Sequence, residues 1–365
     1  MPWTDILNHD GPFERFGRTL QNNRLASTYL FVGPDGIGKR TFALRLAQAL
    51  LCENVSTPLM PCSKCSACQQ VLAQTHPDLI LISKPADKAF IPLAAFIGDA
   101  EHRRQRGLCH DIGLKPFRGG RKIAIIDDAD YLNVEGANSL LKTLEEPPPQ
   151  SLLILIGSSE QKQLSTIVSR SQIVRFDPLT QQHVATLLES MELETSTPID
   201  ELAAAAQGSI ARAIELAEPE VYQFRLDLRK NLASLDPGRD NFGKEILGFV
   251  ESVGKDTSMR RARLKMVGDF AIEFFQEVMY AAIADSSAES SSFLNASADD
   301  DDVVAAIDRL SEDAQFKAEA VAIGIERTVQ MQAQVNYNAS PVNIILPWLK
   351  DLAACLRGGH INVGV

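Results

Sequence analysis

Residues 29–41 read YLFVGPDGIGKRT, and this stretch decides the fold. Its first four residues are apolar or aromatic, which is typical of a buried strand, and Gly33 ends that strand. A helical pattern begins at Lys39. A glycine-rich loop between a strand and a helix is typical of a phosphate loop, in which backbone N–H groups face the phosphates and a lysine reaches the terminal ones. The sequence therefore predicts a nucleotide-type pocket at Gly33, Gly36, Gly38 and Lys39, and a glycine-rich turn without function is the alternative.

Position 40 departs from the phosphate-loop consensus G-x-x-x-x-G-K-[ST]. The consensus Ser or Thr offers a hydroxyl to Mg²⁺, whereas Arg40 brings a positive charge to the place where that cation would lie. Thr41 comes one residue too late, about 100° further around the helix. We therefore expect impaired hydrolysis, with the binding of ATP and Mg²⁺ in doubt.

A second motif, which is acidic, follows the apolar run 122–126, which reads KIAII. Asp127 and Asp128 stand where a Walker B pair is expected, the first carboxylate supporting Mg²⁺ and the second polarising the attacking water. Asp128 replaces the usual Glu and is one methylene shorter, so we expect it to position that water poorly. The alternative is that both acids only cap the next helix.

The remaining apolar runs indicate an α/β fold with a parallel sheet. Runs at 78–82, 152–156 and 173–176 are separated by helical patterns, as in a sheet that helices cover on both faces. After Pro178 only helical patterns remain, first at 180–191 and 199–217. The predicted domains are an α/β core at 1–178, a small helical lid at 179–220 and a larger all-α domain at 221–365.

Four of the six cysteines lie close together, at Cys52, Cys62, Cys65 and Cys68. The spacing C-x₂-C-x₂-C suits one face of a tetrahedral Zn²⁺ site, and Cys52 completes it from the end of the preceding helix. Four thiolates leave no open position, so the zinc is expected to be structural. Iron–sulfur ligation accepts the same spacing, and chance clustering is the remaining alternative.

The composition excludes several classes of protein. Apolar residues make up 45% and charged residues 23% of the chain, as in a folded globular protein. No apolar run approaches the roughly 20 residues of a membrane span, and residues 1–10 do not resemble a secretory signal. We therefore expect a cytoplasmic protein without a membrane partner.

The net charge of -11 is unevenly distributed. Residues 1–180 carry 20 basic and 18 acidic side chains, net +2, and the rest carry 16 and 29, net -13. Any approach to phosphate is therefore expected from the first half. Basic groups at 103–106, 118–122 and 260–265 could touch DNA, although a solvated surface is the more ordinary interpretation. The serine- and aspartate-rich segment 285–302 is predicted to be a loop.

Several motifs occur together in one order along the chain. They are RLASTYLF at 24–31, NSLLKTLEEPP at 138–148, TIVSRS at 166–171 and GSIARA at 208–213. With the phosphate loop and the cysteines that follow its helix, they make residues 1–220 resemble the clamp-loader branch of the AAA+ family, represented by subunits of bacterial DNA polymerase III. The family's versions of the second and third motifs are N-A-L-L-K-x-L-E-E-P-P and T-I-x-S-R-C. Residues 336–338 are more weakly similar to its collar domain.

The resemblance implies a fold and site residues. The fold would be an AAA+ P-loop core with a zinc-binding insertion at 52–68, a helical lid and an all-α collar domain. Arg170 would match the arginine finger, which reaches a neighbouring subunit's ATP. Ser158 would lie near the sensor-1 position and Arg212 near sensor 2, although Arg212 follows Gly208 by one residue more than in the ATPase subunits.

The resemblance also implies a function and partners. The chain would join gamma/tau and delta subunits in a hetero-pentamer that uses ATP to load the sliding clamp onto primer-template DNA. It would donate Arg170 to a neighbouring subunit and would not hydrolyse ATP itself. It would be a component of the DNA-directed DNA polymerase holoenzyme that performs no nucleotidyl transfer of its own. Two alternatives stay open: an autonomous AAA+ ATPase motor of the gamma/tau kind, and a zinc-ribbon adaptor with a decayed nucleotide fold.

Overall fold

The computed structural model describes Trp3 and residues 6–55, 57–85, 87–103, 105–118, 120–234, 241–284, 301–309, 314–335 and 340–356. Internal contacts divide the chain into two units, Met1–Pro219 and Glu220–Val365. Several positions discussed above lie outside the described residues: Arg104, segment 285–300 and residues 336–338. The two units are described separately.

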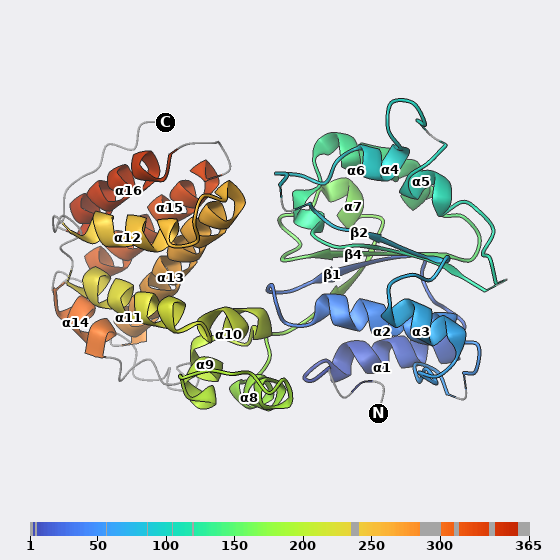
Figure 1. Cartoon of the computed structure of the whole chain (residues 1–365), viewed down its shortest axis with the longest axis horizontal. Coiled ribbons are helices and arrows are strands. Elements are labelled where there is room, and N and C mark those ends of the chain that lie inside the picture. Colours follow the sequence, from blue (N-terminus) through green and yellow to red (C-terminus); the bar gives the residue numbers. More distant parts are fainter. Residues whose placement is uncertain are drawn as a thin grey trace. The chain divides into compact units, whose positions relative to one another are not determined.

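The first unit contains a five-stranded parallel sheet (Figure 1). Its strands lie in the order β2-β3-β4-β1-β5. Its strands are β1 (Thr28–Val32), β2 (Leu79–Ile82), β3 (Lys122–Ile126), β4 (Ser151–Gly157) and β5 (Gln172–Arg175). Strands β1, β3 and β4 are buried at every position, as expected where helices cover both faces. The parallel α/β sheet predicted from the apolar runs is confirmed.

Helices lie on both faces of the sheet (Figure 1). One face carries α1 (Asp10–Gln21), α2 (Lys39–Leu51) and α3 (Ser66–Leu72). The other carries α4 (Ala94–Ile97), α5 (Leu108–Asp111), α6 (Val134–Glu145) and α7 (Ser165–Val168), and a 3₁₀ turn, η1 (Ala129–Tyr131), follows β3. Because the strands are parallel, the loops after β1, β3 and β4 meet at one edge, where ligands bind in open α/β sheets.

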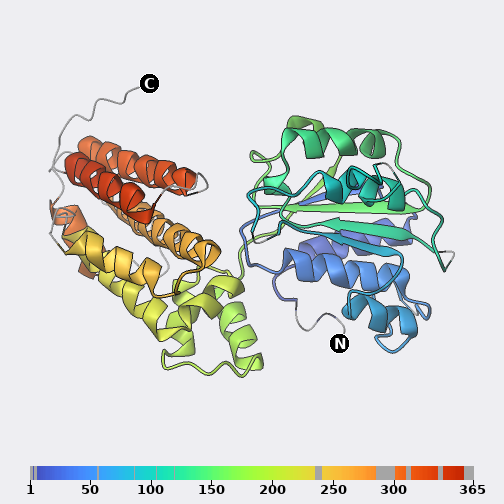
Figure 2. The same cartoon turned by 45° about the horizontal axis from the view of Figure 1, so that its top comes forward.

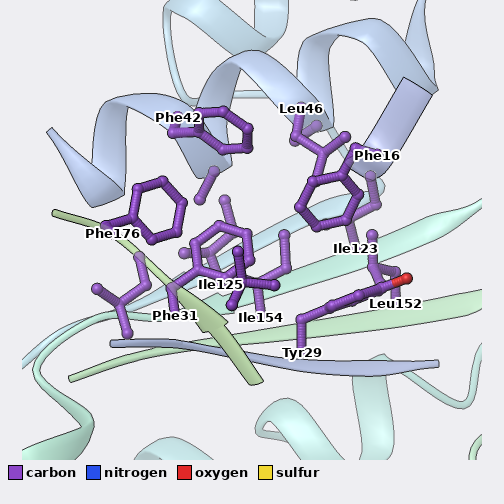
Figure 3. Packing of buried hydrophobic residues seen from close by; sticks show 14 of the residues in the cluster. Phe16, Tyr29, Phe31, Phe42, Leu46, Ile123, Ile125, Leu152, Ile154 and Phe176 are labelled. Atoms are coloured by element: carbon purple, nitrogen blue, oxygen red, sulfur yellow. The ribbon is translucent and has the colours of Figure 1, made fainter. Parts of the chain in front are cut away.

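An aromatic cluster holds α1 and α2 on the sheet (Figure 3). Phe42 of α2 lies 5.9 Å from Phe31 of β1 and 5.1 Å from Phe176, measured between ring centroids. Phe16 of α1 lies 4.8 Å from Tyr29. All five rings are buried, so β1, α2 and the segment after β5 are packed against one another. This packing fixes both ends of the phosphate loop.

Three short helices complete the first unit: α8 (Gln181–Ser190), α9 (Ile199–Ala205) and α10 (Ile210–Leu216). The prediction of a single helix over 199–217 is wrong, because Gln207 and Gly208 have φ angles of 50° and 82° and break it. A Cβ on Gly208 would lie 2.5 Å from the carbonyl oxygen of Leu179, so only glycine allows this close approach. The break turns α10 toward the phosphate loop.

The second unit is helical throughout its described residues (Figure 2). Its helices are α11 (Pro219–Ala233), α12 (Phe242–Glu251), α13 (Thr257–Ala284), α14 (Asp301–Arg309), α15 (Ala314–Gln334) and α16 (Pro341–Leu356). Helix α14 begins inside the segment 285–302 that the sequence predicts as a loop, so that loop's predicted end is wrong. Trp348 donates its ring N–H to the Thr328 hydroxyl at 3.1 Å and so ties α16 to α15.

Two ion pairs cross from α11 to α13. They join Arg225 to Glu273 and Arg229 to Glu277, each at 2.8 Å. Side-chain exposure is 9% and 4% in the first pair and 4% and 16% in the second, so both pairs are removed from water. Among the described residues, no helix combines the length and apolarity needed to cross a membrane.

Candidate functional site

The loop between β1 and α2 depends on glycine at two close approaches. A Cβ on Gly33 would lie 2.3 Å from the carbonyl oxygen of Phe176, and one on Gly36 would lie 2.2 Å from the Ser209 hydroxyl. The φ angle of Gly36 is 74°, which also favours glycine. Ile210 donates its backbone N–H to the Gly36 carbonyl at 3.0 Å. The start of α10 therefore lies directly against the phosphate loop.

Lys39 is buried beneath this loop, with 5% of its side chain exposed. Its ammonium donates to the carbonyl oxygens of Gly33 at 2.6 Å and Pro34 at 2.5 Å, and Asp35 lies 3.7 Å away. Burial lowers the pKa of Lys39, although the nearby aspartates oppose that effect. The lysine is thus held by the loop's own carbonyls, at the position from which it could reach a phosphate.

Arg40 forms an ion pair with Asp127, with 2.9 Å between Nη1 and Oδ2. The second oxygen of Asp127 accepts the backbone N–H of Asp128 at 3.1 Å. The Arg40 guanidinium therefore contacts the carboxylate that would support Mg²⁺ in a hydrolysing site. A divalent cation would have to displace this guanidinium to use Asp127, and position 40 offers no hydroxyl ligand in exchange. These residues do not fit a Mg²⁺ ion.

Asp128 is turned toward the neighbouring strand. Its φ angle is 57°, and its Oδ2 accepts the backbone N–H of Lys84, just beyond β2, at 3.1 Å. Burial raises the pKa of Asp128, and the nearby charge of Asp127 raises it further. A carboxyl group that is partly buried and bonded in this way is poorly prepared to polarise a water molecule.

Ser158 lies directly after β4, and its backbone N–H donates to both oxygens of Asp130 at 3.1 and 3.0 Å. Its hydroxyl oxygen is buried and has no hydrogen-bond partner. Gln163 also donates to Asp130. A buried hydroxyl without a partner is costly unless a ligand or water pairs with it. The Ser158 hydroxyl is therefore ready to contact a bound group.

These residues enclose one cavity of about 490 Å³. It contains predicted site residues from the phosphate loop, the end of β3 and the end of β4, together with α10. The lining residues are Asp35, Gly36, Gly38, Lys39, Arg40, Thr41, Asp127, Asp128, Asp130, Tyr131, Ile156, Gly157, Ser158, Ile210, Ala211 and Ile214. The structure thus brings most of the predicted nucleotide-site residues together, and Gly33 supports them through its carbonyl bond to Lys39.

Arg212 is not among the residues that line this cavity. Helix α10 instead presents Ile210, Ala211 and Ile214 to it. The backbone N–H of Arg212 donates to the Ser209 hydroxyl at 3.2 Å, which caps α10. An apolar stretch of α10 therefore lies beside the phosphate loop.

Two residues of the site carried no sequence prediction. His9 is buried, and its Nε2 lies 2.7 Å from the carbonyl oxygen of Ile37 inside the phosphate loop. Burial lowers the pKa of His9. Asp130 holds the loop after β4, as described above. An isolated histidine in the sequence gives no signal for such a role, whereas Asp130 follows the Walker B position closely enough to be considered.

Arg170 lies between α7 and β5 and does not line the cavity. Its Nη2 is 2.6 Å from Oε1 of Glu145 at the end of α6. Its Nη1 donates to the Thr166 carbonyl and the Ser169 hydroxyl, both at 3.2 Å. Since 33% of the Arg170 side chain is exposed, it is accessible from outside the chain.

The four clustered cysteines form a compact sulfur site. Their Sγ atoms all lie within 4.8 Å of one another, with Cys52 and Cys65 at 4.0 Å and Cys62 and Cys68 at 3.9 Å. Four thiolates at about 2.3 Å from a tetrahedral zinc would be separated by about 3.8 Å. Backbone N–H groups of Lys64 and Cys65 lower the pKa of Cys62 to about 6. The cluster could hold a metal ion, and its geometry is compatible with structural zinc.

The cysteine module is attached to the end of the sheet through Arg118. This side chain pairs with Glu53, next to Cys52, and donates to the Ser66 hydroxyl at 3.2 Å. Asp78 accepts the backbone N–H of Arg118 at 3.3 Å and pairs with Lys122 at the same distance. Lys122 is buried and paired with Asp78, so within the basic group 118–122 this residue is neither a solvated surface side chain nor accessible to DNA.

The sheet order, the loop after β1, the acids after β3 and the short helices after β5 agree with the AAA+ P-loop fold that the sequence resemblance implies. A family model described as "DNA polymerase III, delta subunit" matches residues 9–180. Comparison with curated proteins finds relatives among two kinds of DNA polymerase III subunit. Over residues 9–180, the chain is thus similar to the delta-prime and tau/gamma subunits of DNA polymerase III.

Three relatives illustrate the match. The Bacillus subtilis subunit delta' is 32% identical over 204 residues, which cover 56% of this chain and 57% of that protein. The Pseudomonas aeruginosa subunit delta' is 34% identical over 169 residues, or 46% of each protein. The Haemophilus influenzae subunit tau/gamma is 30% identical over 276 residues, which cover 74% of this chain and 38% of that protein. In these three matches the chain spans about half the length of its relatives or less.

Proposed function

We propose that this chain is a clamp-loader subunit of the delta-prime type, which lends Arg170 to a neighbour and does not hydrolyse ATP itself. The observation that carries this proposal is the Arg40–Asp127 ion pair at 2.9 Å. A site whose metal-binding carboxylate is paired with its own guanidinium lacks the Mg²⁺ that phosphoryl transfer requires. The exposed guanidinium of Arg170 supports a role outside the chain's own cavity.

The proposed function also includes partner subunits and a shared role in loading the sliding clamp. Gamma/tau and delta subunits would complete a hetero-pentameric ring, and their ATP would drive loading of the sliding clamp onto primer-template DNA. The relatives named delta' and tau/gamma support membership in such a DNA polymerase III assembly. Zinc bound by Cys52, Cys62, Cys65 and Cys68 would hold the insertion after α2, with no part in chemistry.

ATP turnover tests the proposal. The purified chain alone is expected to be inactive, whereas the complex with gamma/tau and delta subunits hydrolyses ATP. Arg170→Ala is expected to reduce that turnover by about a thousandfold, because an arginine finger contributes at least this much. Lys39→Ala is expected to leave it unchanged. Turnover by the chain alone near about 1 s⁻¹, lost on Lys39→Ala, would instead support an autonomous motor.

Replacing Arg40 by Thr is expected to create Mg²⁺-dependent nucleotide binding. The change frees Asp127 and supplies a hydroxyl, so Mg²⁺-ATP should bind at least about tenfold more tightly, a gain of about 1.4 kcal/mol. Calorimetric titration with and without EDTA measures the gain. The matched control is Arg45→Thr, on the same helix but outside the cavity. Equal affinities of the Arg40 and Arg45 variants would show that the ion pair does not exclude the cation.

A further inference from the structure

The guanidinium of Arg170 is held in one place by three contacts on the chain itself. One is the 2.6 Å ion pair with Glu145, and the others are hydrogen bonds to the Thr166 carbonyl and the Ser169 hydroxyl. An exposed arginine without such contacts samples many rotamers, and ordering it on binding costs conformational entropy. Arg170 is therefore ordered before any partner arrives.

Glu145 and Arg170 are both attached to helices that pack in the core of the first unit. Glu145 is the last residue of α6, directly after the buried Leu144. On the other side, the buried Ile167 anchors α7, which contains Thr166 and is directly followed by Ser169. The pair thus links two separate elements on one face of the sheet. Its geometry does not depend on a mobile surface loop.

The position of Glu145 at the C-terminus of α6 favours its pairing with a cation such as Arg170. The carbonyl groups at a helix C-terminus create a partial negative charge, which disfavours a carboxylate there. Arg170 offsets that repulsion, and the contact at 2.6 Å is a charge-assisted hydrogen bond. The pair therefore fixes the direction of the guanidinium more strongly than a contact between two neutral groups would.

The same arrangement leaves part of the guanidinium available. Arginine has five N–H donors, and the three contacts described here use three of them. Two donors remain for an anionic group that approaches from outside the chain. Glu145 can consequently stay paired with Arg170 while the arginine contacts a phosphate.

We propose that Glu145 is a positioning residue, which orients Arg170 toward the nucleotide phosphate of a neighbouring subunit. This inference rests on the proposed function, since it requires Arg170 to act in trans. Glu145 touches neither nucleotide nor phosphate and acts only through the arginine. Loss of its charge releases the guanidinium, so the effect falls on the catalytic step of the neighbour and not on nucleotide binding.

The test is steady-state ATP turnover by the full-length chain in complex with its gamma/tau and delta subunits. Glu145→Gln is expected to lower kcat by about tenfold with KM unchanged, because the transition-state contact is weakened. Glu145→Asp is expected to restore part of the loss. The matched control is Glu160→Gln, which breaks a similar exposed pair with Arg175 at 2.8 Å and should leave turnover unchanged.

A double variant separates positioning from a general effect on folding. If Glu145 acts through Arg170, Glu145→Gln should lower turnover no further in an Arg170→Ala background. Full turnover by Glu145→Gln, with Arg170→Ala still inactive, would overturn this inference alone. Full turnover by Arg170→Ala would overturn the proposed function as well. A loss with Glu145→Gln that matches the Glu160→Gln control would assign the effect to general surface charge and overturn the inference.

Discussion

The Cys68→Ser variant is expected to lose bound metal and to unfold on the order of 10 °C below the unsubstituted chain. Cys68 is fully buried in the sulfur cluster, so a serine there removes one of four thiolate ligands. Structural zinc stabilises the fold that binds it. A loss of about 4 kcal/mol shifts the midpoint by roughly 10 °C in a unit of this size. Elemental analysis and thermal unfolding measure the two effects.

The matched control for this variant is Cys109→Ser. Cys109 lies outside the cluster and donates its thiol to the Ser139 carbonyl at 3.4 Å. The control is expected to keep about one zinc per chain and to unfold close to the unsubstituted chain. Iron in place of zinc would favour the iron–sulfur alternative. Unsubstituted chain that binds no metal after refolding with zinc would contradict the prediction.

Breaking one buried ion pair in the second unit is expected to cost about 3–5 kcal/mol of unfolding free energy. Arg225→Met would leave the Glu273 carboxylate, which is 4% exposed, without the partner that lies 2.8 Å from it. Removing one partner is costly because the other charge stays buried. Denaturant unfolding followed by Trp348 fluorescence measures the loss, since Trp348 is buried in this unit.

The double variant Arg225→Met, Glu273→Leu provides the comparison. With neither charge left to desolvate, most of the lost stability should return, because apolar replacements of buried pairs are often neutral or stabilising. The second Trp of the chain, Trp3, lies in the first unit, so Trp3→Phe removes its signal from all samples. A double variant as unstable as Arg225→Met would show that shape, and not charge, sets the cost.

The sheet and the cysteine cluster were predictable because their signals are local. Strands buried on both faces require continuous apolar runs, and those runs are visible at β1, β3 and β4. The cysteine spacing was also sufficient to predict a compact cluster. In contrast, the break between α9 and α10 depends on the φ angle of Gly208, and a single glycine within a helical pattern does not reveal it.

The sequence was sufficient to predict which residues belong to the site, but most of the contacts between them could not be predicted. Arg40 was expected to disturb a metal site, yet its bond to Asp127 joins residues 87 positions apart. The pairing of Arg170 with Glu145 likewise depends on how α6 and α7 pack. The approach of α10 to Gly36 follows from the turn at Gly208. Such contacts are set by tertiary structure, which local sequence patterns do not encode.

The ion pair between Arg40 and Asp127 has a consequence for the working cycle of the assembly proposed above. A bound metal ion leaves and returns as its concentration changes, but a guanidinium attached to the backbone cannot diffuse away. The charge at the end of β3 is therefore balanced in the same way whether the surroundings are rich or poor in magnesium. We expect the charge and the geometry of this cavity to stay the same during each round of ATP hydrolysis by neighbouring subunits.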